Sequence, residues 1–136
     1  MYALTLGAPH LAPLTHPRRI LDIGTGTGIW AIDMADRHPS AQVIGTDLSP
    51  IQPETVPSNC AFQLDDAEGQ WCWDDESFDF VHVREMAGCF ARWDVFLRQA
   101  WRCCRPGGWV EVAEHSNWPV RGSLLFIPFH HRRFTD

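Results

Sequence analysis

The stretch ILDIGTGTGIW, at positions 20–30, constrains the fold more than any other part of the chain. An apolar run ends in Asp22, glycines follow at Gly24, Gly26 and Gly28, and apolar residues then recur at helical spacing. Glycine allows tight turns with unusual backbone angles and lets a ligand approach the main chain closely. The stretch therefore predicts a strand, a ligand-binding loop and a helix, which together begin an α/β unit.

Apolar runs farther along the chain predict the rest of the sheet. Together with the first run they place strands at 19–23, 42–47, 60–64, 78–83 and 109–114. Helices are predicted over 28–38 and over 91–104, where apolar side chains at i, i+3, i+4, i+7, i+8 and i+11 form one stripe. Strands that alternate with helices or helix-length connections predict an α/β fold with a Rossmann-like, doubly wound, mostly parallel sheet. Such sheets bind ligands in a crevice at the carboxyl ends of their strands.

The composition narrows the class of protein. With 136 residues, of which 45% are hydrophobic, the chain can build the core of one domain. The net charge is −6, and all 11 basic residues are arginines without an obvious basic face, so we expect no direct binding of nucleic acid. No apolar run is long enough to cross a membrane. The five cysteines include no Cys-x-x-Cys pair, so we expect reduced thiols, no metal site and a cytoplasmic or nuclear location.

The glycine loop does not fit either of two common phosphate-binding patterns. A P-loop requires a lysine, and the chain contains none. The dinucleotide fingerprint G-x-G-x-x-G, counted from Gly24, requires a third glycine at position 29, where the chain has Ile29. The ligand of this loop therefore need not carry a phosphate.

Acidic residues end the second and third predicted strands. Asp47 follows Gly28 by 19 positions, where an acid accepts hydrogen bonds from the ribose hydroxyls of adenosine ligands in general; the alternative is a capping or turn aspartate. Asp66 belongs to an acidic cluster after the third strand and can accept from an adenine amino group; the alternative is a solvated turn. Both positions favour a nucleoside-type ligand at the glycine loop.

Five blocks in fixed order resemble a known family. DIGTGTG, IGTDLSP, DDAE, FDFVHVR and RPGGWVEVAE resemble the class I S-adenosylmethionine-dependent methyltransferases, and within them the LaeA-like fungal branch, from about residue 10 to residue 114. The resemblance implies S-adenosylmethionine as cofactor and methyl transfer to an unidentified small-molecule or protein acceptor, in the context of secondary metabolism. One alternative is a catalytically silent, cofactor-binding regulator that acts through protein partners. Another, a nicotinamide-dependent oxidoreductase, disagrees with the glycine spacing.

The resemblance also assigns residues to the cofactor, all at strand ends or in the loops that follow them. They are Asp22, Gly24, Thr25 and Gly26 for methionine and ribose, Asp47 and Leu48 for ribose and adenine, Asp66 and Ala67 for the adenine edge, and Val83 and Arg84 for the methyl group.

No catalytic residue is assigned. His82 lies within an apolar strand, where a buried core histidine is the favoured interpretation. Arg84, Glu85, Glu114 and His115 lie at strand ends without a specific signal.

The ends of the chain differ from the pattern of the resembled family. We expect an N-terminal arm at 1–17, a cofactor-binding core at 18–115 and an atypical tail at 116–136. The core has room for five of the usual seven strands, and the fifth strand would then present an unpaired edge.

Overall fold

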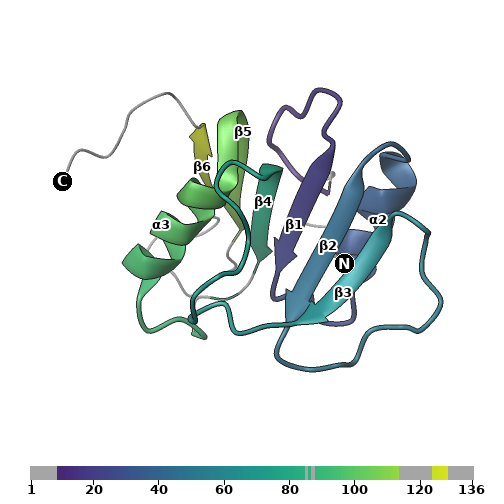
Figure 1. Cartoon of the computed structure of the whole chain (residues 1–136), viewed down its shortest axis with the longest axis horizontal. Helices are drawn as coiled ribbons and strands as arrows, with labels where there is room; N and C mark the ends of the chain where they lie inside the picture. The colour runs from purple at the N-terminus through teal and green to yellow at the C-terminus, as the bar shows by residue number, and fades with distance from the viewer. Residues whose placement is uncertain (1–8, 85, 87, 114–123, 129–136) are drawn as a thin grey trace.

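The computed structural model describes residues 9–84, 86, 88–113 and 124–128, which form one six-stranded sheet with helices on both faces (Figure 1). The strands are β1 (Arg19–Ile23), β2 (Gln42–Asp47), β3 (Cys60–Leu64), β4 (Phe78–Arg84), β5 (Cys104–Ala113) and β6 (Leu124–Pro128). Their order is β3-β2-β1-β4-β5-β6, with β1 to β5 parallel and β6 antiparallel to β5. The predicted doubly wound, mostly parallel α/β fold is confirmed.

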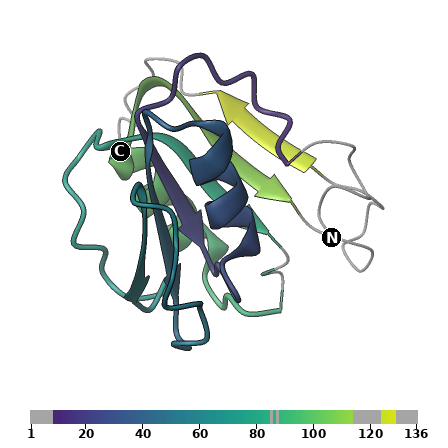
Figure 2. The same ribbon diagram turned by 90° about the vertical axis from the view of Figure 1, so that its right-hand side faces the viewer.

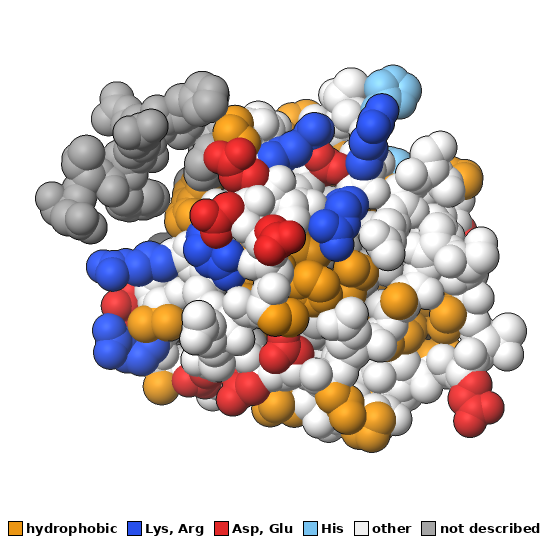
Figure 3. Space-filling model, viewed as in Figure 1, with side chains coloured by type: hydrophobic (Ala, Val, Ile, Leu, Met, Phe, Trp, Pro, Cys, Tyr) orange, Lys and Arg blue, Asp and Glu red, His pale blue; other side chains and the backbone are white. Residues whose placement is uncertain are grey.

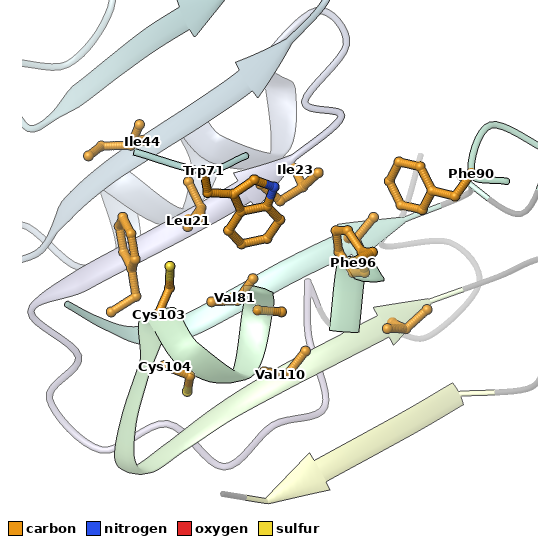
Figure 4. Packing of buried hydrophobic residues seen from close by; sticks show 14 residues of the cluster. Leu21, Ile23, Ile44, Trp71, Val81, Phe90, Phe96, Cys103, Cys104 and Val110 are labelled. Carbon is orange, nitrogen blue, oxygen red and sulfur yellow. The ribbon is translucent and has the colours of Figure 1, made fainter. Parts of the chain in front are cut away.

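The two helices, α2 (Ile29–Arg37) and α3 (Trp93–Cys103), cover opposite faces of the sheet. Figure 2 shows α2 in front of the strands, whereas α3 lies in front of them in Figure 1. Successive strand residues alternate between the two layers. Ile20 and Phe80 belong to the buried cluster on the α2 face, and Leu21 and Val81 belong to the cluster on the α3 face (Figure 4).

The apolar stripe predicted over 91–104 is the inner face of α3. Phe96, Ala100 and Cys103 are buried against the sheet, in the cluster that Figure 4 shows. Aromatic rings extend this contact, since Trp71 meets Phe96 edge to face with 5.5 Å between the ring centroids. The tryptophans near α3 therefore stabilise the core, as the spacing predicts.

The predicted strand count misses β6, which lies within the expected tail. Its residues pair with β5 from Ala113 opposite Leu124 to Trp109 opposite Pro128. The segment LLFIP is apolar throughout, and an unpaired β5 would leave a row of backbone donors and acceptors open for it. The β5 edge that we expected to be exposed is therefore covered by β6.

The fifth strand also begins earlier than position 109. It starts at Cys104, directly after α3, and its register with β4 jumps from Phe78 opposite Cys104 to Phe80 opposite Trp109. The expected turn at 105–108 is thus a bulge inside the strand, since four residues on β5 face one on β4.

The topology fixes where a ligand can bind. The chain leaves β1 toward β2 and β3 on one side, and later passes to β4 and β5 on the other side. The carboxyl ends of β1 to β4 point to the same, lower edge in Figure 1. The switch point of the sheet therefore lies between β1 and β4, beside the glycine loop.

Candidate functional site

The glycine loop turns sharply over the ends of β1 and β2. Gly24, Gly26 and Gly28 have φ angles of 67°, 60° and 84°, in the left-handed region that favours glycine. The Thr25 N–H donates to the Thr46 carbonyl of β2, and the Gly28 N–H donates back to the Thr25 carbonyl, both at 2.9 Å. These bonds give the loop a fixed conformation.

The three glycines have different surroundings. A Cβ atom at Gly24 would lie 2.6 Å from Sδ of Met86, and one at Gly28 would lie 2.3 Å from the ring of Phe62. A Cβ atom at Gly26 would meet nothing within 4 Å. Side chains therefore pack directly against Gly24 and Gly28, whereas Gly26 presents bare backbone to open space that a ligand can fill.

Asp47 binds the glycine loop from the end of β2. Its Oδ2 accepts the Gly26 N–H at 2.8 Å, and its Oδ1 accepts the Ser49 N–H at 3.0 Å. A carboxylate offers about four lone-pair sites, so each oxygen can accept one further hydrogen bond. The half-buried Asp47 carboxylate thus stands next to the open side of Gly26 with acceptor capacity for two hydroxyl groups.

Gln52 closes the same loop, and no sequence pattern identified it. Its Nε2 donates to the Gly26 carbonyl at 2.7 Å and to the Ser49 carbonyl at 2.9 Å. The contact joins positions 26 apart in a proline-rich stretch without periodicity, so only the fold reveals it.

Beyond Asp47, apolar and acidic groups lie in the open. Leu48 is 73% exposed and Ile51 is 57% exposed, so two large apolar side chains lie in the open just after β2. Asp66 is exposed, and its Oδ1 accepts the Glu68 N–H at 3.0 Å. Ala67 is half-buried beside the core. The lower edge of the face in Figure 3 accordingly carries hydrophobic and acidic side chains.

Asp22 is buried, only 3% exposed, instead of facing open space. Its Oδ2 accepts the Thr25 hydroxyl at 2.7 Å, and its Oδ1 lies 2.8 Å from Nδ1 of His82. His82 is 2% exposed, which confirms the interpretation as a core histidine. Asp22 is therefore placed to hold the start of the loop through Thr25.

The end of β4 is less open than expected. Val83 is fully buried in the cluster on the α3 face, between Ile23 of β1 and Val112 of β5. Its side chain is therefore not available to a ligand at the loop. Arg84 is half-buried at the last position of β4. Glu85, Glu114 and His115 lie outside the described residues.

Neither a metal-binding cluster nor a membrane-spanning helix occurs among the described residues. No three His, Cys, Asp or Glu side chains in this part of the chain are grouped so that they could hold a metal ion. No helix in it is long and apolar enough to span a membrane.

Residues 4–135 match the family of methyltransferase domains. The chain belongs to this family. The methyltransferase pytC of Aspergillus terreus is 50% identical over 109 residues, which make up 79% of this chain and 33% of pytC. The secondary metabolism regulator laeA of Aspergillus flavus is 44% identical over 73% of this chain and 28% of its own length. The protein-methionine methyltransferase laeA of Emericella nidulans is 42% identical over 73% of this chain and 27% of its own length.

A solved methyltransferase shares the fold. Phosphoethanolamine N-methyltransferase 2 of Haemonchus contortus, in complex with S-adenosylmethionine, is 26% identical with a TM-score of 0.66. The match covers 76% of this chain and 25% of that one. The chain spans about a third of the length of the curated relatives it matches. The resemblance to class I and LaeA-like methyltransferases is confirmed.

The methyltransferase domain thus brings most of the assigned residues to one edge of the sheet. Those at this edge are Asp22, Gly24, Thr25, Gly26, Asp47, Leu48, Asp66 and Ala67. Gly26 leaves open space for a ligand, beside the half-buried carboxylate of Asp47 and the exposed apolar side chain of Leu48. Asp22 and Thr25 bind each other, so their part is to hold the loop.

Proposed function

We propose that this chain is the S-adenosylmethionine-binding domain of a methyltransferase. The observation that carries the proposal is the pairing of Gly26 with Asp47, in which bare backbone with open space beside it is hydrogen-bonded to a carboxylate with spare acceptor capacity. A ribose has two neighbouring hydroxyl groups, which match that capacity. The solved relative that holds this cofactor supports the proposal.

The remaining groups fit the other parts of the cofactor. Leu48 would pack against the adenine, since its side chain is apolar and exposed. Asp66 and Ala67 would meet the adenine edge, and Gly26 would line the methionine, while Thr25 holds the loop. The acidic and apolar character of this edge suits a ligand that carries a positive charge and an aromatic base.

The bound cofactor supplies a methyl group that its own sulfonium charge makes electrophilic. The task of the chain is to fix that group so that an acceptor can approach in line with the breaking bond. The glycine loop, which Asp47 and Gln52 hold by hydrogen bonds to Gly26, would perform this fixing, because it is ordered before the ligand arrives. Such a pre-ordered loop reduces the entropy lost on binding.

For the acceptor we propose a protein side chain or a small molecule. The name of the Emericella nidulans relative, a protein-methionine methyltransferase, supports the first, and methyltransferase pytC leaves the second open. A regulator that acts through protein partners, in the cytoplasm or the nucleus, is the second candidate. The similarity to the secondary metabolism regulator laeA favours it.

Transfer of radiolabelled methyl groups tests this function. The chain is incubated with tritiated S-adenosylmethionine and either methionine-containing peptides or a small-molecule extract. We expect label in one of the two fractions, lost in Asp47→Ala and kept in Asp36→Ala, a control on the exposed side of α2. Saturable cofactor binding without label in either fraction would instead support the regulator.

A further inference from the structure

Three ionisable side chains lie side by side in the layer under α2. Asp22 of β1 is the register partner of His82 on β4, and His82 is the register partner of Glu111 on β5. They are 3%, 2% and 0% exposed, in a layer that also holds the apolar cluster on the α2 face and the half-buried His10, whose ring packs against Phe80. Because burial of a charged group is costly, such a row persists only when each member has a partner.

His82 is held on two sides. Its Nδ1 lies 2.8 Å from Oδ1 of Asp22, and because a carboxylate only accepts, Nδ1 must carry the hydrogen and donate it. Its ring stacks on the indole of Trp30, with 3.8 Å between the centroids and 3° between the planes. The Trp30 Nε1–H in turn donates to the Pro9 carbonyl at 2.7 Å. The orientation of the imidazole is therefore fixed.

The contact continues from Asp22 to the glycine loop. The other carboxylate oxygen, Oδ2, accepts the Thr25 hydroxyl at 2.7 Å, and the Thr25 N–H is bonded to β2. Thr25 directly precedes Gly26, the glycine with open space beside it. Two hydrogen bonds therefore link His82 through Asp22 to Thr25, and Thr25 is the chain neighbour of the glycine with open space beside it.

We propose that His82 is a positioning residue for the glycine loop. Its Nδ1–H holds the Asp22 carboxylate in the orientation in which Oδ2 accepts the Thr25 hydroxyl. Without this donor, Asp22 would have a buried, unpaired oxygen, and its carboxylate would be free to rotate away from Thr25. The effect on cofactor affinity rests on the proposed function, whereas the effect on loop order does not.

Three substitutions of His82 distinguish the role of its Nδ1–H donor from the role of its ring. His82→Asn places an amide nitrogen where Nδ1 stands, whereas His82→Gln places it near the position of Nε2. His82→Phe keeps the ring that stacks on Trp30 and removes the donor. His38→Gln is the matched control, since His38 caps α2 at the end away from the loop.

The first readout is amide hydrogen exchange in the ligand-free chain. The N–H groups of Thr25, Gly26 and Gly28 are all hydrogen-bonded, so we expect these amides to be protected from exchange in the wild type. We expect protection to persist in His82→Asn and His38→Gln and to fall in His82→Gln and His82→Phe. Core amides of β2 should keep their protection in His82→Gln, which distinguishes loss of loop order from unfolding.

The second readout is calorimetric titration with S-adenosylhomocysteine. Loss of a hydrogen bond to a charged group predicts weakening on the order of tenfold in His82→Gln and His82→Phe, against little change in His82→Asn. If the wild type shows the expected loop protection but no binding, the proposed function fails, and the exchange rates of the His82 variants alone decide the positioning role.

A third readout needs no variant, which matters if His82→Phe does not fold. In a ¹H–¹⁵N spectrum of the wild type, Nδ1 of His82 should be protonated. An unprotonated Nδ1, or wild-type loop protection and affinity in His82→Gln, would overturn the proposal.

Discussion

At the scale of single residues, the glycine loop must both pack against neighbouring side chains and leave space for a ligand. Gly24, Gly26 and Gly28 all have positive φ, but a methyl group would collide with packed side chains at the outer two positions and not at Gly26. The loop was predictable from the sequence, because the spacing of the three glycines is visible there. Which glycine has open space beside it was not predictable, because the side chains that pack against the other two, Met86 and Phe62, come from distant positions.

Alanine substitutions at two of these glycines should therefore have different effects. Gly26→Ala should weaken S-adenosylhomocysteine binding by at least an order of magnitude, because its methyl group fills the ligand's space, at a stability cost of about 1–2 kcal/mol for the left-handed backbone. Gly28→Ala adds overlap with Phe62 and should cost about 2–4 kcal/mol. Calorimetry and denaturant unfolding measure the two effects. Equal binding by Gly26→Ala and wild type would contradict this account of the loop.

The cysteines give a second prediction at this scale. Burial raises the pKa of Cys60 to about 11 and that of Cys104 to about 12, and it also raises the pKa of buried Cys103. Cys72 and Cys89 are exposed. Because the thiolate is the reactive form, iodoacetamide at neutral pH should modify only these two in the folded chain and all five in denaturant. Intact mass spectrometry counts the adducts, and rapid labelling of Cys104 would show that this part of the core is open.

At the scale of elements, the sequence predicts strands and helices most accurately where the apolar residues recur with a clear period. β1 to β5, α2 and α3 lie where the apolar runs and stripes predict them. The early start of β5 was missed, because proline and two glycines usually mark a turn, and here they form a bulge held by β4. The sequence also did not predict that residues 9–12 pack against the sheet. This packing depends on a contact between Leu11 and Glu111, which are 100 positions apart.

That contact is made by Glu111, whose buried carboxylate accepts the N–H groups of Leu11 and Ala12 at 3.0 and 3.3 Å. Glu111→Ala removes both acceptors, so the segment should detach from the sheet. We expect faster amide exchange at these two positions, by on the order of tenfold or more, and no change in Glu54→Ala, an exposed control. Unchanged exchange in Glu111→Ala would show that apolar contacts alone hold the segment.

At the scale of the whole molecule, the candidate site lies at the carboxyl ends of the strands, and β6 covers the outer edge of β5. The strand ends gather the groups that we propose to bind the cofactor at the lower edge of Figure 1, while β6 pairs with β5 on the other side of the sheet. β6 could not be predicted, because a five-residue apolar run has no periodicity that distinguishes a strand from other buried structure. The segment LLFIP forms a strand because the edge of β5 is available for pairing.

A chain that ends at Ser123 tests the role of β6. Loss of this strand exposes one side of the β5 backbone from Trp109 to Ala113, the stretch with which β6 pairs. We expect a lower thermal midpoint and self-association that grows with concentration, measured by scanning calorimetry and light scattering beside the full chain. A shortened chain that stays monomeric with an unchanged midpoint would show that β6 contributes nothing to edge protection.

The most direct test of the proposed cofactor site is calorimetric titration of the chain with S-adenosylhomocysteine and, in a separate titration, with NAD. We predict saturable binding of S-adenosylhomocysteine alone, abolished in Asp47→Ala, which loses the carboxylate bound to Gly26, and retained in Asp36→Ala. Absence of binding to a folded wild-type chain, or equal binding by Asp47→Ala, would contradict the claim that the glycine loop and Asp47 form the cofactor site.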